Sequence, residues 1–357
     1  LDALVTHGDP DNVAPPPKAG GGVVLLTSGT TGRPKGAPRP HIGTFDAAVS
    51  LLSLLPLRAR DTTVIAAPLF HTWGFAQLSL GLLMSSTYVL TAEFDAEATL
   101  RTVAENHATV LVAVPVMLSR VLALPDDVRS RYDTSSLRVV AVSGSALQPT
   151  LAAAFMDAFG EILYNLYGST EVAWATVATP RDLRAAPGTV GRPPRGTAVR
   201  LLDGDGVQVP SGEPGRIFVS NDMSFGGYSG GGDKERRGAL VATGDVGRFD
   251  EAGRLFVEGR DDEMIVSGGE NVFPAEVEDC LAAHPGVAEV AVVGVEDAEF
   301  GQRLRAYVVA GAEKPSADEL RTHVRTSLAR HKVPRDVVFV NALPRNAAGK
   351  VVKRELR

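Results

Sequence analysis

The sequence predicts an α/β protein of layered sheets: a large N-terminal domain that contains a β-rich subdomain, followed by a small C-terminal α+β domain. Three changes of pattern support this prediction. Short β-rich runs alternate with helical stretches over 22–166, tight turns join short strands over 198–258, and a new helix-and-strand pattern starts near 260. We therefore expect a large domain over 1–260, with the β-rich subdomain at about 189–260, and a small domain over 261–357.

The first part of the chain has the alternation that builds sheets with helices packed on them. Its strands are expected where β-branched and apolar residues cluster, and its helices where apolar residues recur at helical spacing. Asp95 is a natural N-cap for one of these helices. The expected strands are 23–27, 63–66, 87–91, 109–113, 137–142 and 162–166. The expected helices are 45–55, 74–84, 95–107 and 148–159.

The later parts of the chain mix short strands with two helices. Ser316 and Glu319 form the sequence pattern of a capping box, which predicts the start of the second helix. The expected strands are 198–202, 216–220, 254–258, 287–295 and 304–309, and the expected helices are 274–284 and 316–329.

The composition is that of an ordinary globular protein and excludes several classes. Of the 357 residues, 44% are hydrophobic and 22% charged, which argues against disordered and fibrous proteins. The formal net charge of −6 implies no overall attraction to nucleic acid or anionic lipid. The longest stretch without charged residues, 62–92, contains Pro68, His71 and Gln77, so we expect two elements and a loop there, not a membrane span. The single cysteine, Cys280, suits the reducing cytoplasm, where we place the protein; its oligomeric state is left open.

A run dense in glycines and hydroxyls follows the first predicted strand. Glycines let the backbone approach an anion, consecutive amide N–H groups form a concave nest, and hydroxyls with Lys35 add donors and charge. The run lacks the Gly-Lys-Ser/Thr spacing of a Walker A loop. A polar surface turn is the alternative, but the density of these residues favours a phosphate-binding loop. Its candidate residues are Thr27, Ser28, Gly29, Thr30, Thr31, Gly32 and Lys35.

This loop resembles the signature loop of the adenylate-forming superfamily, which includes acyl- and aryl-CoA synthetases, peptide-synthetase adenylation domains and beetle luciferases. Other segments resemble the same superfamily in the same order, and together they are far more specific than any one alone. The chain looks most like a bacterial fatty-acyl-CoA synthetase from Val23 onward, with about the first third of the usual family chain absent before Leu1. The matching segments are 68–71, 143–146, 167–171, 243–245, 259–262 and 344–350.

The resemblance implies an ATP-dependent ligase that works in two half-reactions. A carboxylate attacks the α-phosphate of ATP to give an acyl-adenylate and pyrophosphate, and the thiol of coenzyme A then displaces AMP. ATP, Mg²⁺ and coenzyme A are therefore the expected cofactors and small-molecule partners, together with the acid. The small C-terminal domain is expected to be a mobile lid that pivots at Asp262 between the two half-reactions.

The resemblance also assigns nucleotide-binding roles. The loop would hold the β- and γ-phosphates, Thr170 would donate to the α-phosphate, and Glu171 would bind Mg²⁺, a hard cation suited to oxygen ligands. Tyr167 would stack on adenine and Asp245 would accept the ribose hydroxyls. Besides the loop and these residues, the expected nucleotide- and coenzyme-binding residues are Gly144, Ser145, Ala146, Asn165, Gly168, Arg260, Ser267, Gly268, Gly269, Asn271 and Lys350.

The same resemblance implies three candidates for catalysis. Lys350 would stabilise the charge that develops between the carboxylate and the α-phosphate, and Thr170 would contact the same phosphate. His71 would orient the acid and need not act as a base, because the attacking carboxylate is already ionised. The alternatives are a solvated lysine on the tail and a histidine packed among apolar neighbours.

The acid is expected to be a fatty acid, with an aryl acid as the alternative. No carboxylate follows Phe70 where peptide synthetases usually hold an ammonium group, and the run 269–278 looks most like fatty-acyl-CoA ligases. A nucleotide-binding fragment without catalysis, lacking its front segment, is the competing class, and oxygenation of the luciferase type has no dedicated signature. The expected pocket residues are Trp73, Phe75, Val172, Ala173 and Trp174.

Overall fold

The computed structural model describes residues 23–26, 36–38, 46–229, 233–267, 270–297, 300–346 and 350–356. The predicted phosphate-binding residues 27–35 and the glycines Gly268 and Gly269 lie outside the described residues. The backbones of Asp262 and Asn271 are described, but their side chains are not.

The main sheet has the strand order β4-β3-β5-β6-β7-β8 within the described residues. Its strands run parallel, except that β8 pairs antiparallel with β7. The central strands β5 and β6 have the sequences VLVA and VVAV and are buried throughout, as expected for a parallel sheet covered on both faces. The strands are β3 (Thr62–Ile65), β4 (Thr87–Leu90), β5 (Val110–Ala113), β6 (Val139–Val142), β7 (Leu163–Tyr167) and β8 (Thr176–Ala178).

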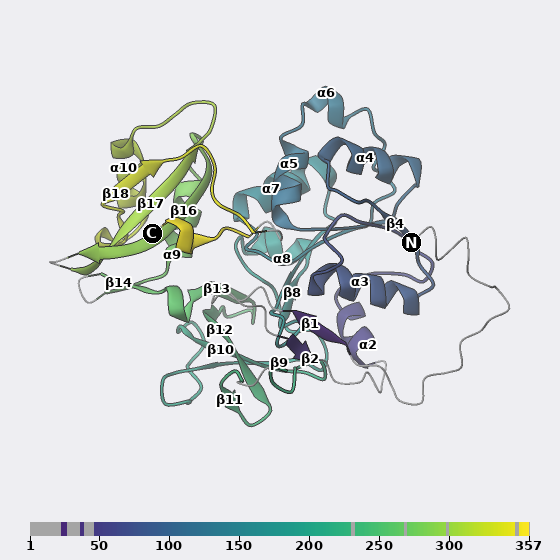
Figure 1. Cartoon of the computed structure of the whole chain (residues 1–357), viewed down its shortest axis with the longest axis horizontal. Helices are drawn as coiled ribbons and strands as arrows, with labels where there is room; N and C mark the ends of the chain where they lie inside the picture. Colours follow the sequence, from purple (N-terminus) through teal and green to yellow (C-terminus); the bar gives the residue numbers. More distant parts are fainter. Residues whose placement is uncertain are drawn as a thin grey trace.

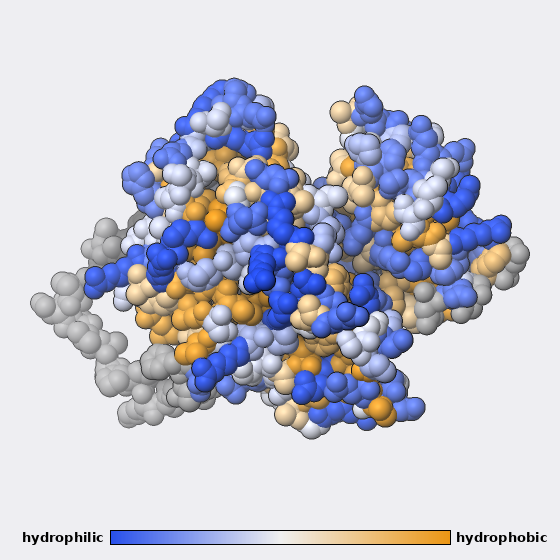
Figure 2. All heavy atoms as spheres, turned by 180° about the vertical axis from the view of Figure 1, so that it is seen from behind, coloured by the Kyte–Doolittle hydropathy of each residue, from blue (hydrophilic) through white to orange (hydrophobic). Residues whose placement is uncertain are grey.

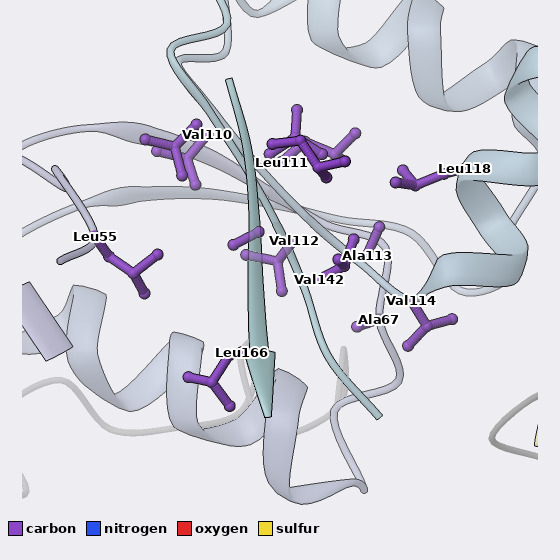
Figure 3. Close-up of a cluster of buried hydrophobic side chains, with 14 of the residues drawn as sticks. Leu55, Ala67, Val110, Leu111, Val112, Ala113, Val114, Leu118, Val142 and Leu166 are labelled. Carbon is purple, nitrogen blue, oxygen red and sulfur yellow. The ribbon is translucent and has the colours of Figure 1, made fainter. Parts of the chain in front are cut away.

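Helices pack on this sheet and begin at residues that suit helix starts. Asp95 caps one of them, since its side chain accepts a hydrogen bond from the Ala98 amide (2.7 Å), which confirms the predicted N-cap. Figure 3 shows side chains of the central strands together with Leu55 and with Leu118 in one core. The helices are α2 (Asp46–Leu52), α3 (Thr72–Leu83), α4 (Ala96–Glu105), α5 (Pro115–Leu122), α6 (Asp126–Arg129), α7 (Pro149–Phe159) and α8 (Pro180–Ala185).

The second sheet is antiparallel, with the order β11-β12-β10-β9 and β13 paired to β12. β12 was not among the predicted strands, because Gly244 and Gly247 interrupt its apolar pattern and the pairing shifts register between Val246 and Gly247. Near it, β1 (Val24–Leu26) pairs with β2 (Gly36–Pro38). The strands are β9 (Ala198–Leu202), β10 (Gly215–Ser220), β11 (Arg236–Arg237), β12 (Leu240–Phe249) and β13 (Leu255–Arg260).

The C-terminal part has its own sheet, ordered β15-β14-β17-β16 with β18 parallel to β17, and its own buried core. The predicted capping box forms, since Ser316 Oγ accepts from the Glu319 amide (3.2 Å) and Glu319 Oε2 accepts from the Ser316 amide (2.7 Å). The elements are η1 (Asp261–Glu263), β14 (Ile265–Ser267), β15 (Glu270–Val272), α9 (Pro274–Ala282), β16 (Val287–Asp297), β17 (Gly301–Ala310), α10 (Ala317–Ser327), η2 (Arg330–Lys332), β18 (Asp336–Phe339) and η3 (Lys353–Leu356).

A cleft separates the C-terminal part from the rest of the molecule. Figure 1 shows the C-terminal sheet at the left, the main sheet with its helices at the upper right and the second sheet below. Figure 2 shows the surface hollowed between the two upper lobes. The cleft has a volume of about 2050 Å³ and is lined by residues of the main sheet, the second sheet and the C-terminal sheet. Among the described residues, no helix is long and apolar enough to cross a membrane. The domain boundaries expected from the sequence stay predictions.

Candidate active site

The carboxyl ends of the parallel strands open into the cleft. Residues that follow β3, β5, β6 and β7 all line it, in keeping with the general position of ligand sites in parallel α/β sheets. The segments 143–146 and 167–171, which the sequence singled out, are the loops after β6 and β7. Because these strands are neighbours in the sheet, the two loops lie side by side.

The loop after β7 depends on Gly168. A Cβ atom at this position would lie 2.3 Å from the Ala173 carbonyl oxygen, which no side chain can tolerate. The chain therefore turns tightly back into β8, and Ala173 takes a positive φ of 62°. This turn leaves Tyr167, Thr170 and Glu171 at the wall of the cleft.

Tyr167 connects the main sheet to Asp245 on the second sheet. Its hydroxyl donates to Asp245 Oδ2 (2.5 Å), and the Asp245 amide donates to Thr243 Oγ1 (3.1 Å). Burial raises the pKa of Tyr167 well above its usual range, and the neighbouring Asp245 carboxylate raises it further. Tyr167 therefore stays protonated and acts as a hydrogen-bond donor at neutral pH.

Asp245 and Arg260 face each other across β12 and β13. They are directly paired in the register, and Arg260 Nη1 lies 3.4 Å from Asp245 Oδ1. Burial raises the pKa of Asp245, whereas Tyr167, Arg260 and the Lys350 ammonium each act to lower it. The carboxylate has hydrogen bonds on both oxygens, and each oxygen keeps a further lone pair for a ligand hydroxyl.

Glu171 is buried and receives a hydrogen bond that the sequence did not reveal. The Tyr228 hydroxyl donates to Glu171 Oε1 (2.5 Å), and burial followed by this contact raises the pKa of Tyr228. Tyr228 was interpreted as part of a glycine-rich loop, because nothing local in 226–232 marks it as functional. Its position in the cleft beside the predicted metal-binding carboxylate makes it an additional candidate residue.

His71 is the N-cap of α3 and lines the cleft. Burial lowers its pKa, so the ring is neutral at pH 7. Its Nε2 atom is buried without a hydrogen-bond partner among the described residues, and its ring contacts Phe70 with centroids 4.3 Å apart. A buried imidazole nitrogen without a protein partner can hydrogen-bond a bound ligand.

Lys350 enters the same cleft from the C-terminal tail. Its side chain is exposed, and its charge acts on Asp245 of the second sheet. The structure thus places a lysine of the small domain beside the large-domain residues Tyr167, Asp245 and Arg260. This arrangement is compatible with the role in adenylation that the sequence predicts for Lys350, and that role stays a prediction.

The structure brings most, but not all, of the predicted site residues together. Ser267 lies on β14 outside the cleft lining, and the backbone of Asn271 lies on the adjoining β15. The loop 27–35, Gly268 and Gly269 are not among the described residues. The roles of all predicted residues stay predictions. Those that line the cleft are His71, Gly144, Ser145, Ala146, Asn165, Tyr167, Gly168, Thr170, Glu171, Asp245, Arg260 and Lys350.

The predicted acid pocket needs one correction. Trp73, Phe75, Ala173 and Trp174 line the cleft. Val172 was wrong, because it is fully buried in the core beside the second sheet and does not reach the cleft. Residues 171–173 form a turn, with Ala173 at a φ of 62°, and this turn directs the Val172 side chain into the core and away from the cleft.

Comparison with known proteins identifies the family. Residues 5–229 match the family described as AMP-binding enzyme, and residues 276–350 match the AMP-binding enzyme C-terminal domain. The first match covers more than half of the chain. The protein therefore belongs to the AMP-binding enzymes of the adenylate-forming superfamily, with the mixed α/β fold and small C-terminal domain of that superfamily.

Individual relatives carry different substrate names. The chain is 36% identical to an indoleacetate–CoA ligase of Aromatoleum aromaticum, over 94% of this chain and 66% of that protein. It is 31% identical to the long-chain-fatty-acid–CoA ligase FadD13 of Mycobacterium tuberculosis, again over 94% and 66%. The crystal structure of ATP-bound MatB from Rhodopseudomonas palustris superposes with a TM-score of 0.84 at 31% identity, over 94% of this chain and 67% of MatB. The chain thus spans about two thirds of the length of these relatives.

Proposed function

We propose that this protein is an AMP-forming acid–CoA ligase. In the first half-reaction a carboxylate oxygen attacks the α-phosphorus of ATP, and the bond to the bridging oxygen of pyrophosphate breaks. In the second, the sulfur of coenzyme A attacks the acyl carbon and AMP leaves. The observation that carries the proposal is the convergence of Lys350 from the small domain with Tyr167, Asp245 and Arg260 of the large domain in one cleft.

The nucleoside is proposed to bind between the two large-domain sheets. Asp245 accepts the ribose hydroxyls, because it is anchored by Tyr167 and Arg260 and keeps lone pairs free for further bonds. The flat ring of Tyr167 and the loop 143–146 offer a place for adenine. MatB is named as ATP-bound in its own structure, which supports the same ligand class here.

Three residues are assigned to the phosphates: Lys350 as the cation, Thr170 as a hydroxyl donor and Glu171 as the residue that would hold Mg²⁺. A cation and a hydroxyl held around the α-phosphate would stabilise the negative charge of the transition state without reorganising during the reaction. The described residues hold no cluster of three metal-binding side chains. Glu171 alone still fits Mg²⁺, which usually takes one or two carboxylates and completes its shell with phosphate oxygens and water. Bound there, Mg²⁺ would neutralise phosphate charge.

The acid is proposed to lie beside His71. The neutral ring, with its unpartnered buried Nε2, can donate to the substrate carboxylate and hold it in line for attack. Trp73 is fixed by its indole N–H, which donates to the Ala113 carbonyl (3.0 Å), and together with Phe75 and Trp174 it gives the cleft lining apolar surface. We propose a fatty acid as the substrate and keep an aryl acid as the alternative, since this apolar surface suits both and the relatives include both.

The test is acid-dependent ATP–pyrophosphate exchange, followed by identification of the acyl-CoA product by mass spectrometry. A panel of octanoate, palmitate, ferulate and indoleacetate separates aliphatic from aromatic substrates. Exchange with a fatty acid and formation of its CoA thioester are expected. Nucleotide binding by calorimetry without exchange for any acid would instead favour the non-catalytic binding protein, and absence of both would overturn the assignment.

A further inference from the structure

In the C-terminal tail, residues 344–346 are joined by hydrogen bonds to residues 350–352, the segment that begins with Lys350. Arg345 and Val351 form an antiparallel bridge, and the Val352 amide donates to the Pro344 carbonyl (2.8 Å). Asn346 holds Lys350 twice, because its amide donates to the Lys350 carbonyl (2.9 Å) and its Oδ1 accepts from the Lys350 amide (3.0 Å). The backbone of Lys350 is therefore fixed relative to the tail itself.

The tail must in turn be fixed to the rest of the molecule. Arg345 pairs with Glu289 of β16 (3.0 Å) and Leu356 packs against the same strand, and Lys353 adds the connection that also reaches the turn between the domains. Its Nζ atom lies 2.8 Å from Glu278 Oε1 and 3.4 Å from Glu263 Oε2. Glu278 belongs to α9, and its Oε1 also accepts from the Val292 amide of β16 (2.6 Å). Glu263 ends η1, the turn directly after the last strand of the second sheet.

This ion cluster lies largely out of water. The Lys353 side chain is 23% exposed and the Glu278 side chain 14%. Burial lowers the pKa of Lys353, but the two glutamates raise it more, and the net pKa lies above its usual value. The ammonium therefore remains charged. Removing one partner of a buried ion pair leaves the others uncompensated, so the cluster holds its geometry strongly.

We propose that Lys353 is a positioning residue that sets where the Lys350 ammonium enters the cleft. Lys353 is engaged by two carboxylates, which leaves it poorly suited to bind phosphate itself. It ties the tail both to the body of the small domain, through Glu278, and to the turn between the domains, through Glu263. The inference rests on the proposed function, because it assigns Lys353 an effect on adenylation that passes through Lys350.

The first experiment compares Lys353→Met with the conservative variant Lys353→Arg and with a matched control at Lys332. Lys353→Met keeps the length and apolar stem but removes the charge, so we expect kcat for pyrophosphate exchange to fall by about 10- to 100-fold, as for a misplaced catalytic group. KM for ATP should change by less than about threefold. Thioester formation from supplied acyl-AMP should be spared, and Lys353→Arg should recover most of the exchange activity.

Lys332→Met is the matched control. Lys332 also pairs with a carboxylate of α9, with its Nζ 2.5 Å from Glu276 Oε2, but it belongs to η2 and not to the tail. Loss of the Lys332 charge should leave ATP–pyrophosphate exchange near the parental rate. Equal losses in Lys332→Met and Lys353→Met would show that any α9 ion pair merely supports the small domain, and would overturn the proposal.

A double-mutant cycle tests whether Lys353 acts through Lys350. Once Lys350 is replaced by Ala, adding Lys353→Met should cost no further exchange activity, because there is no ammonium left to position. Independent, multiplicative losses of pyrophosphate exchange would contradict the proposal.

Amide hydrogen exchange of 350–356 provides a readout that does not need activity: the amide hydrogens of the tail should exchange faster in Lys353→Met but not in Lys332→Met. Unchanged amide hydrogen exchange of the tail in Lys353→Met overturns the positioning role. An unmodified protein that is inactive with every acid overturns only the proposed function.

Discussion

Lys350 and Asp245 come from different domains and occupy one electrostatic environment. The Lys350 ammonium is one of the groups that oppose the rise in the Asp245 pKa caused by burial. The sequence motifs predicted both residues individually, but not the contacts that hold them. Tyr228 and Lys353 act on Glu171 and Glu278 from more than fifty positions away along the chain, and no local pattern indicates such pairs.

The first prediction concerns Lys350. Replacing it with Ala removes a charge aimed at the reacting centre, and ATP–pyrophosphate exchange should fall by about 10²–10³ or more. Conversion of supplied acyl-AMP and coenzyme A to thioester should be largely retained, because that step does not need this charge. The exposed Lys314 of the same domain, changed to Ala, serves as the control. Equal loss in both half-reactions would refute the assignment.

The second prediction concerns Asp245. Asp245→Asn presents an amide where the ribose needs acceptors, so the affinity for ATP should fall by about tenfold or more. Calorimetric titration with ATP–Mg²⁺ measures this directly. Asp250→Asn is a fair comparison, because Asp250 pairs with Arg254 in the hairpin between β12 and β13, away from the cleft. Unaltered ATP affinity in Asp245→Asn would remove Asp245 from the nucleotide site.

At the scale of elements, strands and helices with strong local signals were predicted well. The α4 N-cap at Asp95 and the capping box at Ser316 are confirmed, since both depend only on neighbouring residues. β12 was missed because its glycines serve the site and not the strand: Gly244 has a φ of 87° where the chain passes under Arg260. The sequence pattern therefore did not predict the strand that carries Asp245, because glycines, which are unfavourable in strands, are placed there for the site.

The third prediction concerns η1, the turn that joins the two domains. Its middle residue, Asp262, was predicted as the hinge, and the backbone there follows directly from β13. Pro at this position fixes φ and restricts rotation, so thioester formation should fall much more than adenylation. Asp262→Ala leaves φ free and should affect both half-reactions little. Parental rates for both steps in Asp262→Pro would exclude this residue as the pivot.

At the scale of the whole molecule, an aspartate of the small domain contacts a glutamine of the large domain. Asp279 of α9 lies in the cleft beside Gln148, the N-cap of α7 in the large domain. The net pKa of Asp279 is raised to about 6: burial is the largest cause, Glu278 and Glu276 also raise the pKa, and the hydrogen bond from Gln148 lowers it. Gln148 Oε1 has no partner among the described residues, so a protonated Asp279 would offer it a donor.

Asp279→Asn is therefore expected to stabilise the folded protein, with α9 in contact with the large domain, in a pH-dependent way. Because the folded pKa lies above the ordinary 3.8, the folded state binds the proton more tightly, and stability falls as pH rises between about 4 and 6. The Asn variant loses this penalty, so its gain in stability should be larger at pH 7.5 than at pH 4.5, by about 2 kcal/mol. Thermal melting of parent and variant at both pH values measures the difference.

Since the variant favours the arrangement with Lys350 in the cleft, its thioester step should slow while pyrophosphate exchange is maintained. A gain that is the same at both pH values would show that burial does not raise the pKa of Asp279 in the folded protein.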